Sequence, residues 1–186
     1  RVVEELNPQV PVALHLDHGT SYEQNVQCLR AGFTSLMYDG SKEPFETNVA
    51  VSADIIRMAH ACGIPVECEL GLIPKIEDYL TEEQMKPLRE GKAESVLDLL
   101  SEEQVQKLYA NSTNPDQALE FKERTGCDSM AVAIGAIHGM TGRGSKLDFE
   151  LLQKLMDKVG LPFVLHAASG IPLDQMKIAC QKGVCK

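Results

Sequence analysis

The chain alternates short apolar runs with longer amphipathic segments, and this alternation predicts parallel strands joined by helices. Val, Leu, Ile and Ala dominate the apolar runs, which lie at residues 10–19, 33–41, 64–71, 127–139, 161–170 and 184–186. The segments between them place apolar residues at helical spacing and end at a glycine, at residues 21–32, 44–63, 114–126, 148–160 and 172–183. Strand and helix signals in this order are typical of repeated βαβ units and a parallel sheet.

One segment departs from the alternation. Residues 72–112 are dense in Glu and Lys and contain two helical pieces, "TEEQMKPL" and "SVLDLLSEEQVQKLY". Connections of this length form functional lids or carry additional helices. We therefore expect residues 1–186 to form a single α/β domain with a helical insertion at about residues 72–112.

Polar, chemically capable side chains fall where the predicted strands end. The first run ends in Asp17 and His18, and the second ends in Asp39. The later runs end in Glu67 and Glu69, in His138, and in His166. Since the carboxyl ends of parallel strands share one side, these groups should meet where barrels and doubly wound sheets bind ligands.

Three histidines in this set favour a metal site. A single histidine at a strand end is more often a hydrogen-bonded structural residue, but three on one face resemble the donor set of catalytic zinc. Neutral imidazoles suit Zn²⁺ or a similar ion and leave a position for a substrate oxygen. We therefore expect His18, His138 and His166 to be metal ligands.

The carboxylates allow two interpretations each. Asp17 either orients a histidine or transfers a proton, and its place beside His18 favours proton transfer. Asp39 is either a turn-forming residue in "DGS" or part of the site. Glu69 would be costly to bury without a partner, which favours a cation or a hydrogen bond. Glu77, taken alone, is a solvated charge of an acidic loop.

The two remaining histidines and one small-residue turn complete the candidates. His15 could support a metal ligand through a hydrogen bond, whereas His60 precedes the glycine end of its helix and should lie at the surface. Residues 166–170, "HAASG", form a turn before a helix, where backbone N–H groups can bind a phosphate.

Composition narrows the classes of function. The chain has 186 residues, 44% of them hydrophobic, and a net charge of −9. The acidic balance argues against nucleic-acid binding, and no apolar run approaches the ~20 residues that span a bilayer. Six cysteines without a Cys-x-x-Cys pair indicate reduced thiols in a cytoplasmic protein, not a cysteine zinc site.

The runs "VALHLDHG", "SLMYDGS", "VECELG", "AVAIGAIHG" and "VLHAASG" resemble, in this order, the class II metal-dependent ketose-bisphosphate aldolases. These are the fructose- and tagatose-1,6-bisphosphate aldolases, which fold as (β/α)₈ TIM barrels. The resemblance runs from about residue 10 to the end. It implies an α/β barrel from which the first two strands and most of the eighth are absent, and hence a longer polypeptide.

The resemblance also implies an activity and a cofactor. A ketose 1,6-bisphosphate would be cleaved to dihydroxyacetone phosphate and glyceraldehyde 3-phosphate, a reaction of carbohydrate metabolism and glycolysis. Zn²⁺ would polarise the carbonyl and stabilise the enediolate, so that no Schiff-base lysine is needed. By resemblance, the zinc ligands are His18, His138 and His166, and the residues near a second cation are Asp39 and Glu69.

The same resemblance assigns proton-transfer and substrate roles. Asp17 matches the acid/base at the C4 hydroxyl, and Glu77 matches a loop glutamate that assists proton transfer at the enediolate carbon. Gly139, Ser169 and Gly170 match positions that contact dihydroxyacetone phosphate. The expected small-molecule partner is a sugar phosphate, and the motifs fit either C4 epimer. The expected protein partner is a second copy of the chain, in a homodimer or larger oligomer.

The chain also departs from the family pattern at two places. "HAASG" stands where the family usually has His-Gly-Gly-Ser-Gly, and "LIPKIEDYL" replaces a glycine-rich loop. These changes keep open a non-catalytic barrel relative that binds a sugar phosphate. A metal-dependent hydrolase on the same fold is a third hypothesis, against which the missing His-x-His pair counts.

Overall fold

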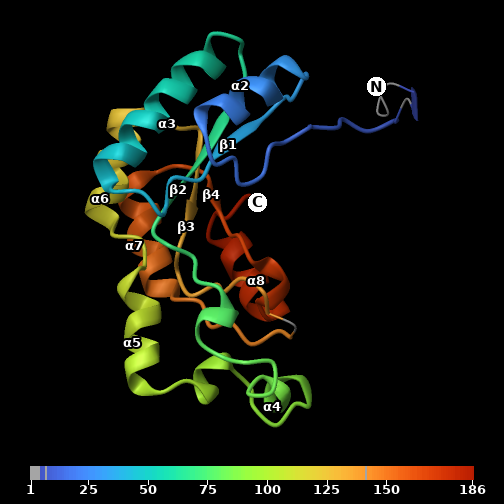
Figure 1. Cartoon of the computed structure of the whole chain (residues 1–186), viewed down its shortest axis with the longest axis vertical. Helices are drawn as coiled ribbons and strands as arrows, with labels where there is room; N and C mark the ends of the chain where they lie inside the picture. Colours follow the sequence, from blue (N-terminus) through green and yellow to red (C-terminus); the bar gives the residue numbers. More distant parts are fainter. Residues whose placement is uncertain (1–4, 7, 141) are drawn as a thin grey trace.

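A computed structural model describes residues 5, 6, 8–140 and 142–186, and its centre is a four-stranded parallel sheet (Figure 1). Each strand pairs with the next one along the chain, and two isolated parallel bridges, His15 to Ser35 and Phe163 to Val184, extend the sheet at its edges. A sequential order without reversal is the order of a (β/α)₈ barrel and not of a doubly wound sheet. The strands are β1 Leu36–Tyr38, β2 Val66–Leu70, β3 Ser129–Val132 and β4 Phe163–Val164.

Helices alternate with the strands as the sequence predicts. They are α2 Tyr22–Arg30, α3 Phe45–His60, α6 Pro115–Thr125, α7 Phe149–Val159 and α8 Leu173–Gln181. Figure 1 shows α3, α6 and α7 beside one another along one side of the strands, with α3 contacting α6 and α6 contacting α7.

The ends of α6 show why these helices form where they do. The side chain of Asn114 accepts hydrogen bonds from the backbone N–H groups of Asp116 and Gln117, which have no partner inside the helix. Pro115 occupies the first turn, where its missing N–H costs nothing. Gly126 ends the helix in the left-handed conformation. The predicted start and stop of this helix are therefore confirmed.

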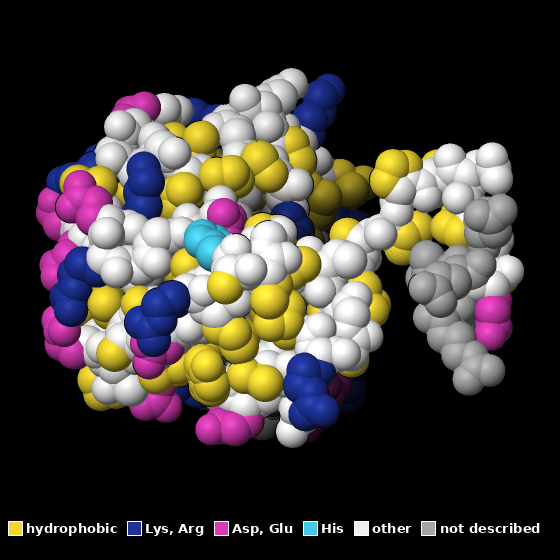
Figure 2. Space-filling view, turned by 90° about the horizontal axis from the view of Figure 1, so that it is seen from above, with side chains coloured by type: hydrophobic (Ala, Val, Ile, Leu, Met, Phe, Trp, Pro, Cys, Tyr) yellow, Lys and Arg dark blue, Asp and Glu magenta, His cyan; other side chains and the backbone are white. Residues whose placement is uncertain are grey.

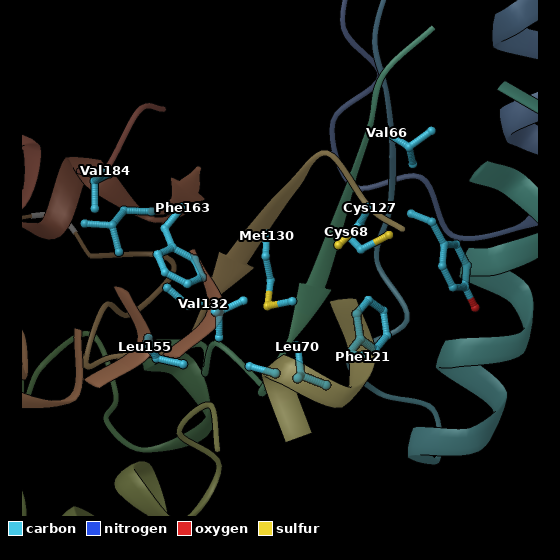
Figure 3. Close-up of a cluster of buried hydrophobic side chains, with 14 of the residues drawn as sticks. Val66, Cys68, Leu70, Phe121, Cys127, Met130, Val132, Leu155, Phe163 and Val184 are labelled. Atoms are coloured by element: carbon cyan, nitrogen blue, oxygen red, sulfur yellow. The ribbon is translucent and has the colours of Figure 1, made fainter. Parts of the chain in front are cut away.

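Strand β2 buries apolar side chains on one face and two carboxylates on the other. Val66, Cys68 and Leu70 belong to the main hydrophobic core between sheet and helices, together with Phe121 and Phe163 (Figure 3). Because side chains alternate along a strand, Glu67 and Glu69 point to the other face. Neighbouring positions on the other strands hold a separate buried apolar cluster, which consists of Met37, Ala131 and Val164.

The predicted strand before residue 18 is shorter than expected. Only His15 makes a bridge, with Leu16 N–H donating to the Ser35 carbonyl at 3.0 Å. The side chains of Val10, Val12 and Leu14 are exposed, so no packing holds this edge segment extended. The last predicted run likewise makes only the bridge at Val184.

Residues 72–112 extend past one end of the sheet (Figure 1) and form a small hydrophobic cluster together with Ile137 and Met140. The single helix predicted from residue 95 is divided in two. Ser101 accepts a hydrogen bond from Gln104 N–H while the Gln104 side chain accepts from Ser101 N–H, and this capping box starts a new helix. The elements are the 3₁₀ helices η1 Ile76–Asp78 and η2 Val96–Leu99 and the α-helices α4 Lys86–Arg89 and α5 Glu102–Ala110.

Among the helices of the described residues, none is both long and apolar enough to cross a bilayer. Basic and acidic side chains are interspersed over the face shown in Figure 2.

Replacing Phe121 by Ala should lower the free energy of unfolding by about 3–5 kcal/mol, because its ring is fully buried against the sheet. Leu173→Ala, at a side chain that is 65% exposed, should change it by less than about 0.5 kcal/mol. Urea unfolding followed by circular dichroism measures both. Equal losses in the two variants would contradict this placement of the core.

Candidate metal centre

Three histidines from distant parts of the chain meet at the ends of the strands. The ring centroids of His18 and His166 lie 4.3 Å apart, and those of His18 and His138 lie 5.4 Å apart. His138 and His166 are separated by 6.4 Å. The predicted convergence of these imidazoles is therefore present in the structure.

Local backbone geometry brings His18 to this place. His18 has a φ of 48°, in the left-handed backbone region that residues other than glycine rarely adopt. The next residue, Gly19, lies so close to β1 that an added Cβ would be 2.3 Å from the Met37 carbonyl oxygen. The Gly19 carbonyl accepts a hydrogen bond from Asp39 N–H at 2.8 Å. The His-Gly pair thus turns the chain sharply and joins it to the end of β1.

His18 faces two carboxylates. Its Nδ1 lies 3.0 Å from Asp39 Oδ2 and 3.8 Å from Glu69 Oε2. The hydrogen bond with Asp39 raises the pKa of His18. Burial alone would raise the pKa of Asp39, but hydrogen bonds from His18 and Ser41 outweigh burial and lower it to about 2. Since ionised Asp39 only accepts hydrogen bonds, Nδ1 carries the proton, and neutral His18 has its lone pair on Nε2.

Glu69 is the least compensated acid of the group. The residue is 2% exposed, and among the described residues Oε2 has no hydrogen-bond partner. Burial, followed by repulsion from Asp39, raises the pKa of Glu69 to about 8. A buried carboxylate oxygen without a partner is costly, and a cation would offset that cost.

His166 is oriented by another buried acid. Its Nε2 lies 2.8 Å from Glu67 Oε1, and its Nδ1 lies 3.8 Å from Asp17 Oδ1. Burial opposes ionisation of Glu67, but hydrogen bonds from His166 and Lys186 outweigh burial and lower its pKa. The ionised Glu67 accepts the Nε2 proton, so the lone pair of neutral His166 is on Nδ1, on the side of Asp17.

His138 is held by its backbone. Its N–H donates to the Pro74 carbonyl at 2.9 Å, and its carbonyl accepts from Ile76 N–H at 2.9 Å, which makes a parallel bridge with Lys75. Burial, and then the neighbouring His18 and His166, lower the pKa of His138. A neutral imidazole is the form that binds metals.

A cavity of about 360 Å³ opens beside these residues, within the range of small-ligand pockets. The bridge at His138 brings Glu77 into its wall, although the Glu77 side chain is 67% exposed. Two lysines, Lys42 and Lys75, also contribute to the wall. The remaining predicted site residues in the wall are His18, Asp39, Glu69, His138 and Gly139.

Two predicted substrate contacts lie outside this wall. Ser169 is exposed in the 3₁₀ helix η3 Ala168–Gly170, and the Gly170 carbonyl accepts from Ser145 N–H at 2.9 Å. The preceding Ala167 has a φ of 59°, so an alanine occupies a left-handed position here. The proposed contacts of Ser169 and Gly170 remain predictions.

The two other histidines have separate partners. His60 Nε2 lies 2.8 Å from Asp128 Oδ2, and both side chains are exposed, consistent with a surface residue. His15 Nδ1 lies 2.8 Å from Ser35 Oγ and its Nε2 lies 2.9 Å from Lys186 Nζ. Burial, and then the Lys186 charge, lower the pKa of His15. With both ring nitrogens engaged, His15 does not face the cavity as a free ligand.

The donor set fits a cation. Candidate ligand atoms of Asp17, His18 and His166 lie within 4.8 Å of one another, and so do those of His18, Asp39 and Glu69. His18 belongs to both groups. His138 belongs to neither, and its ring centroid lies 5.4 Å from that of His18 and 6.4 Å from that of His166. Imidazole and carboxylate ligands in this proportion suit zinc or a related first-row ion.

The sequence interpretation assigned no role to two residues that support this site. Glu67 holds His166, and Lys186 Nζ lies 2.7 Å from Glu67 Oε2. Both carry the signal that identified the others, a charged residue within or after an apolar run. Lys186 could not be placed at a strand end from sequence, because only Val184 and Cys185 of its apolar run precede it.

Comparison with known proteins gives a consistent result. The family described as fructose-bisphosphate aldolase class-II matches residues 1–186. Fructose-bisphosphate aldolase of Geobacillus stearothermophilus is 37% identical over 185 residues, which are 100% of this chain and 56% of that protein. The Thermus caldophilus fructose-bisphosphate aldolase is 41% identical over 166 residues, 88% of this chain and 47% of that protein.

A solved structure agrees with these relatives. The YdjI aldolase from Escherichia coli K12 matches with a TM-score of 0.74 and 36% identity, over 100% of this chain and 56% of that one. The chain thus spans about half the length of the relatives it matches.

Replacing Ala167 by Gly should leave the free energy of unfolding unchanged or raise it by up to about 1 kcal/mol, because the left-handed conformation costs an L-residue about 1–2 kcal/mol. Ala168→Gly, one residue later and without a positive φ, should lower it by about 0.5–1 kcal/mol. Thermal unfolding of the two variants measures the difference. A larger loss in Ala167→Gly would show that the strained turn is misplaced.

Proposed function

This chain belongs to the class II fructose-bisphosphate aldolase family, whose fold is the TIM barrel, and we propose that its protein cleaves a ketose 1,6-bisphosphate. The products would be dihydroxyacetone phosphate and glyceraldehyde 3-phosphate. The convergence of His18, His138 and His166 beside Asp17, at the carboxyl ends of the strands, carries the proposal.

The three histidines would hold Zn²⁺, and Asp39 and Glu69 would take part in holding a second cation. A divalent ion there supplies Lewis acidity toward the substrate carbonyl. Asp39 accepts a hydrogen bond from Nδ1 of His18, and Glu67 accepts one from Nε2 of His166. In the neutral rings, the other nitrogen of each histidine then has a lone pair for the ion. Carboxylate–histidine pairs of this kind orient the rings and increase their basicity.

Asp17 and Glu77 are the proposed proton carriers. The Asp17 side chain is 62% exposed and lies 3.8 Å from both His166 and Lys186, so it is accessible to a substrate hydroxyl beside the metal ligands. It would take the proton of the C4 hydroxyl during cleavage. Glu77 is part of the cavity wall beside Gly139, where an added Cβ would be 3.4 Å from Glu77 Oε2. It would return a proton at the enediolate carbon.

The substrate phosphates need positive charge and backbone donors. Lys42 and Lys75 provide ammonium groups in the wall of an otherwise acidic cavity. Gly139, Ser169 and Gly170 would contact dihydroxyacetone phosphate, with the turn around Ser169 supplying N–H groups. We also propose a cytoplasmic location, in keeping with six free cysteines. Assembly as a homodimer or larger oligomer is proposed from the family resemblance alone.

Asp17→Asn should lower kcat by about 10²–10⁴, because the amide cannot accept the hydroxyl proton. The assay couples release of triose phosphates from fructose and tagatose 1,6-bisphosphate, using the protein at its full native length. Asp54→Asn, at an exposed acid of α3, is the matched control and should keep full activity. Unchanged cleavage by Asp17→Asn would refute its role as the acid/base.

Zinc should bind stoichiometrically to the wild-type protein, and EDTA should abolish cleavage until zinc is restored. His18→Ala should lose the metal, whereas His60→Ala should retain it because His60 pairs with Asp128 outside the site. Metal content by mass spectrometry after gel filtration measures both variants. A protein that binds zinc but cleaves neither epimer would support the alternative, a non-catalytic relative that binds sugar phosphates.

A further inference from the structure

The segment after α8, residues 184–186, brings the side chain of one lysine to the buried acid Glu67 of β2. Leu165 N–H donates to the Lys186 carbonyl at 2.9 Å, and Cys185 N–H donates to the Phe163 carbonyl at 2.9 Å. These bonds fix the backbone of Lys186 alongside the end of β4. From there its side chain reaches Glu67, a residue 119 positions away in sequence.

Three distances describe a continuous chain of contacts. Lys186 Nζ lies 2.7 Å from Glu67 Oε2, and Glu67 Oε1 lies 2.8 Å from His166 Nε2. Lys186 Nζ also lies 2.9 Å from His15 Nε2. Glu67 is 3% exposed and His166 is 8% exposed, so neither group can exchange its partner for water without moving.

The hydrogen-bonding chemistry fixes every proton along this chain. An ammonium group only donates, so Lys186 donates to Glu67 Oε2 and to His15 Nε2. His15 therefore carries its proton on Nδ1, which donates to Ser35 Oγ. With Oε2 satisfied by Lys186, Glu67 presents Oε1 to the Nε2 proton of His166. The Nδ1 lone pair of His166 is then left toward Asp17 and the site.

We propose that Lys186 is a positioning residue that, through Glu67, holds His166 in the orientation and tautomer in which its Nδ1 can bind a metal ion. This inference rests on the proposed metal centre and deepens it. Without Lys186, Glu67 Oε2 would be buried with only His15 Nε2 near it among the described residues, at 3.7 Å and beyond hydrogen-bond distance, which leaves a charged oxygen desolvated. The carboxylate would then turn to find another donor, and His166 would lose its orienting acceptor.

The primary test measures zinc affinity by competition with a chromophoric chelator, on the full-length protein. Lys186→Met should weaken zinc binding by about 10–100-fold, the usual effect of removing an outer partner of a metal ligand. Lys186→Arg, which keeps the charge and the donors, should recover part of the loss. Lys182→Met, at a lysine bonded to Gln153 on the surface, is the matched control and should match wild type.

A double-mutant cycle tests whether Lys186 acts through Glu67. If it does, adding Lys186→Met to Glu67→Gln should cost little more than Glu67→Gln alone, because the two residues act as one unit. Losses that add, or a Lys186→Met protein with wild-type zinc affinity, would overturn the proposal. Circular dichroism confirms that each variant is folded.

Nitrogen-15 NMR of the metal-free protein provides a readout that needs neither metal nor activity. Wild type should show His166 protonated at Nε2, and Lys186→Met should show a mixture of tautomers, with signals assigned from a His166→Gln variant. An unchanged tautomer in Lys186→Met would overturn the proposal. If wild type binds zinc without cleaving bisphosphates, the proposed function fails while the affinity cycle still decides on Lys186. If wild type binds no zinc, the tautomer measurement decides.

Discussion

The structure depends on two carboxylates that β2 buries on the side of the sheet away from the helices. Glu67 and Glu69 are both less than 4% exposed, and their strand is central in the sheet. Burying ionised carboxylates is unfavourable unless positive charge or hydrogen-bond donors meet them. The two acids solve this problem differently. Glu67 has Lys186 and His166, while Oε2 of Glu69 has no partner among the described residues.

This contrast explains the division of the site. The paired acid, Glu67, is hydrogen-bonded to His166 and does not line the cavity, and its donors outweigh its burial and lower its pKa. The uncompensated acid, Glu69, lines the cavity with His18 and Asp39 and retains a raised pKa of about 8. A cation bound there would offset the energetic cost of burying Glu69, which supports the proposed metal centre. The main core, on the opposite face of β2, supplies the stability that tolerates this cost.

The sequence predicted the parts of this arrangement that depend on periodicity. Alternation of apolar runs and amphipathic segments indicated the parallel order. The rule that carboxyl ends of parallel strands share one side indicated that His18, His138 and His166 lie together. It overestimated the strand before His18, because the exposed Val12 and Leu14 find no packing there. Periodicity also missed the break at Ser101, where a local capping box competes with the apolar pattern.

Other features depend on contacts between residues far apart in sequence, which no local pattern encodes. The bridge between Lys75 and His138 is such a feature, because it ties a metal-ligand candidate to the segment that bears Glu77. The two backbone hydrogen bonds of His138 join it to Pro74 and Ile76, so the insertion and the proposed metal centre are connected through the same residue. The small cluster of the insertion includes Ile76 beside Ile137, which packs the two sides of this bridge together. A shift of the insertion would therefore move Glu77 and the His138 backbone together, which couples the proposed proton carrier to a proposed metal ligand.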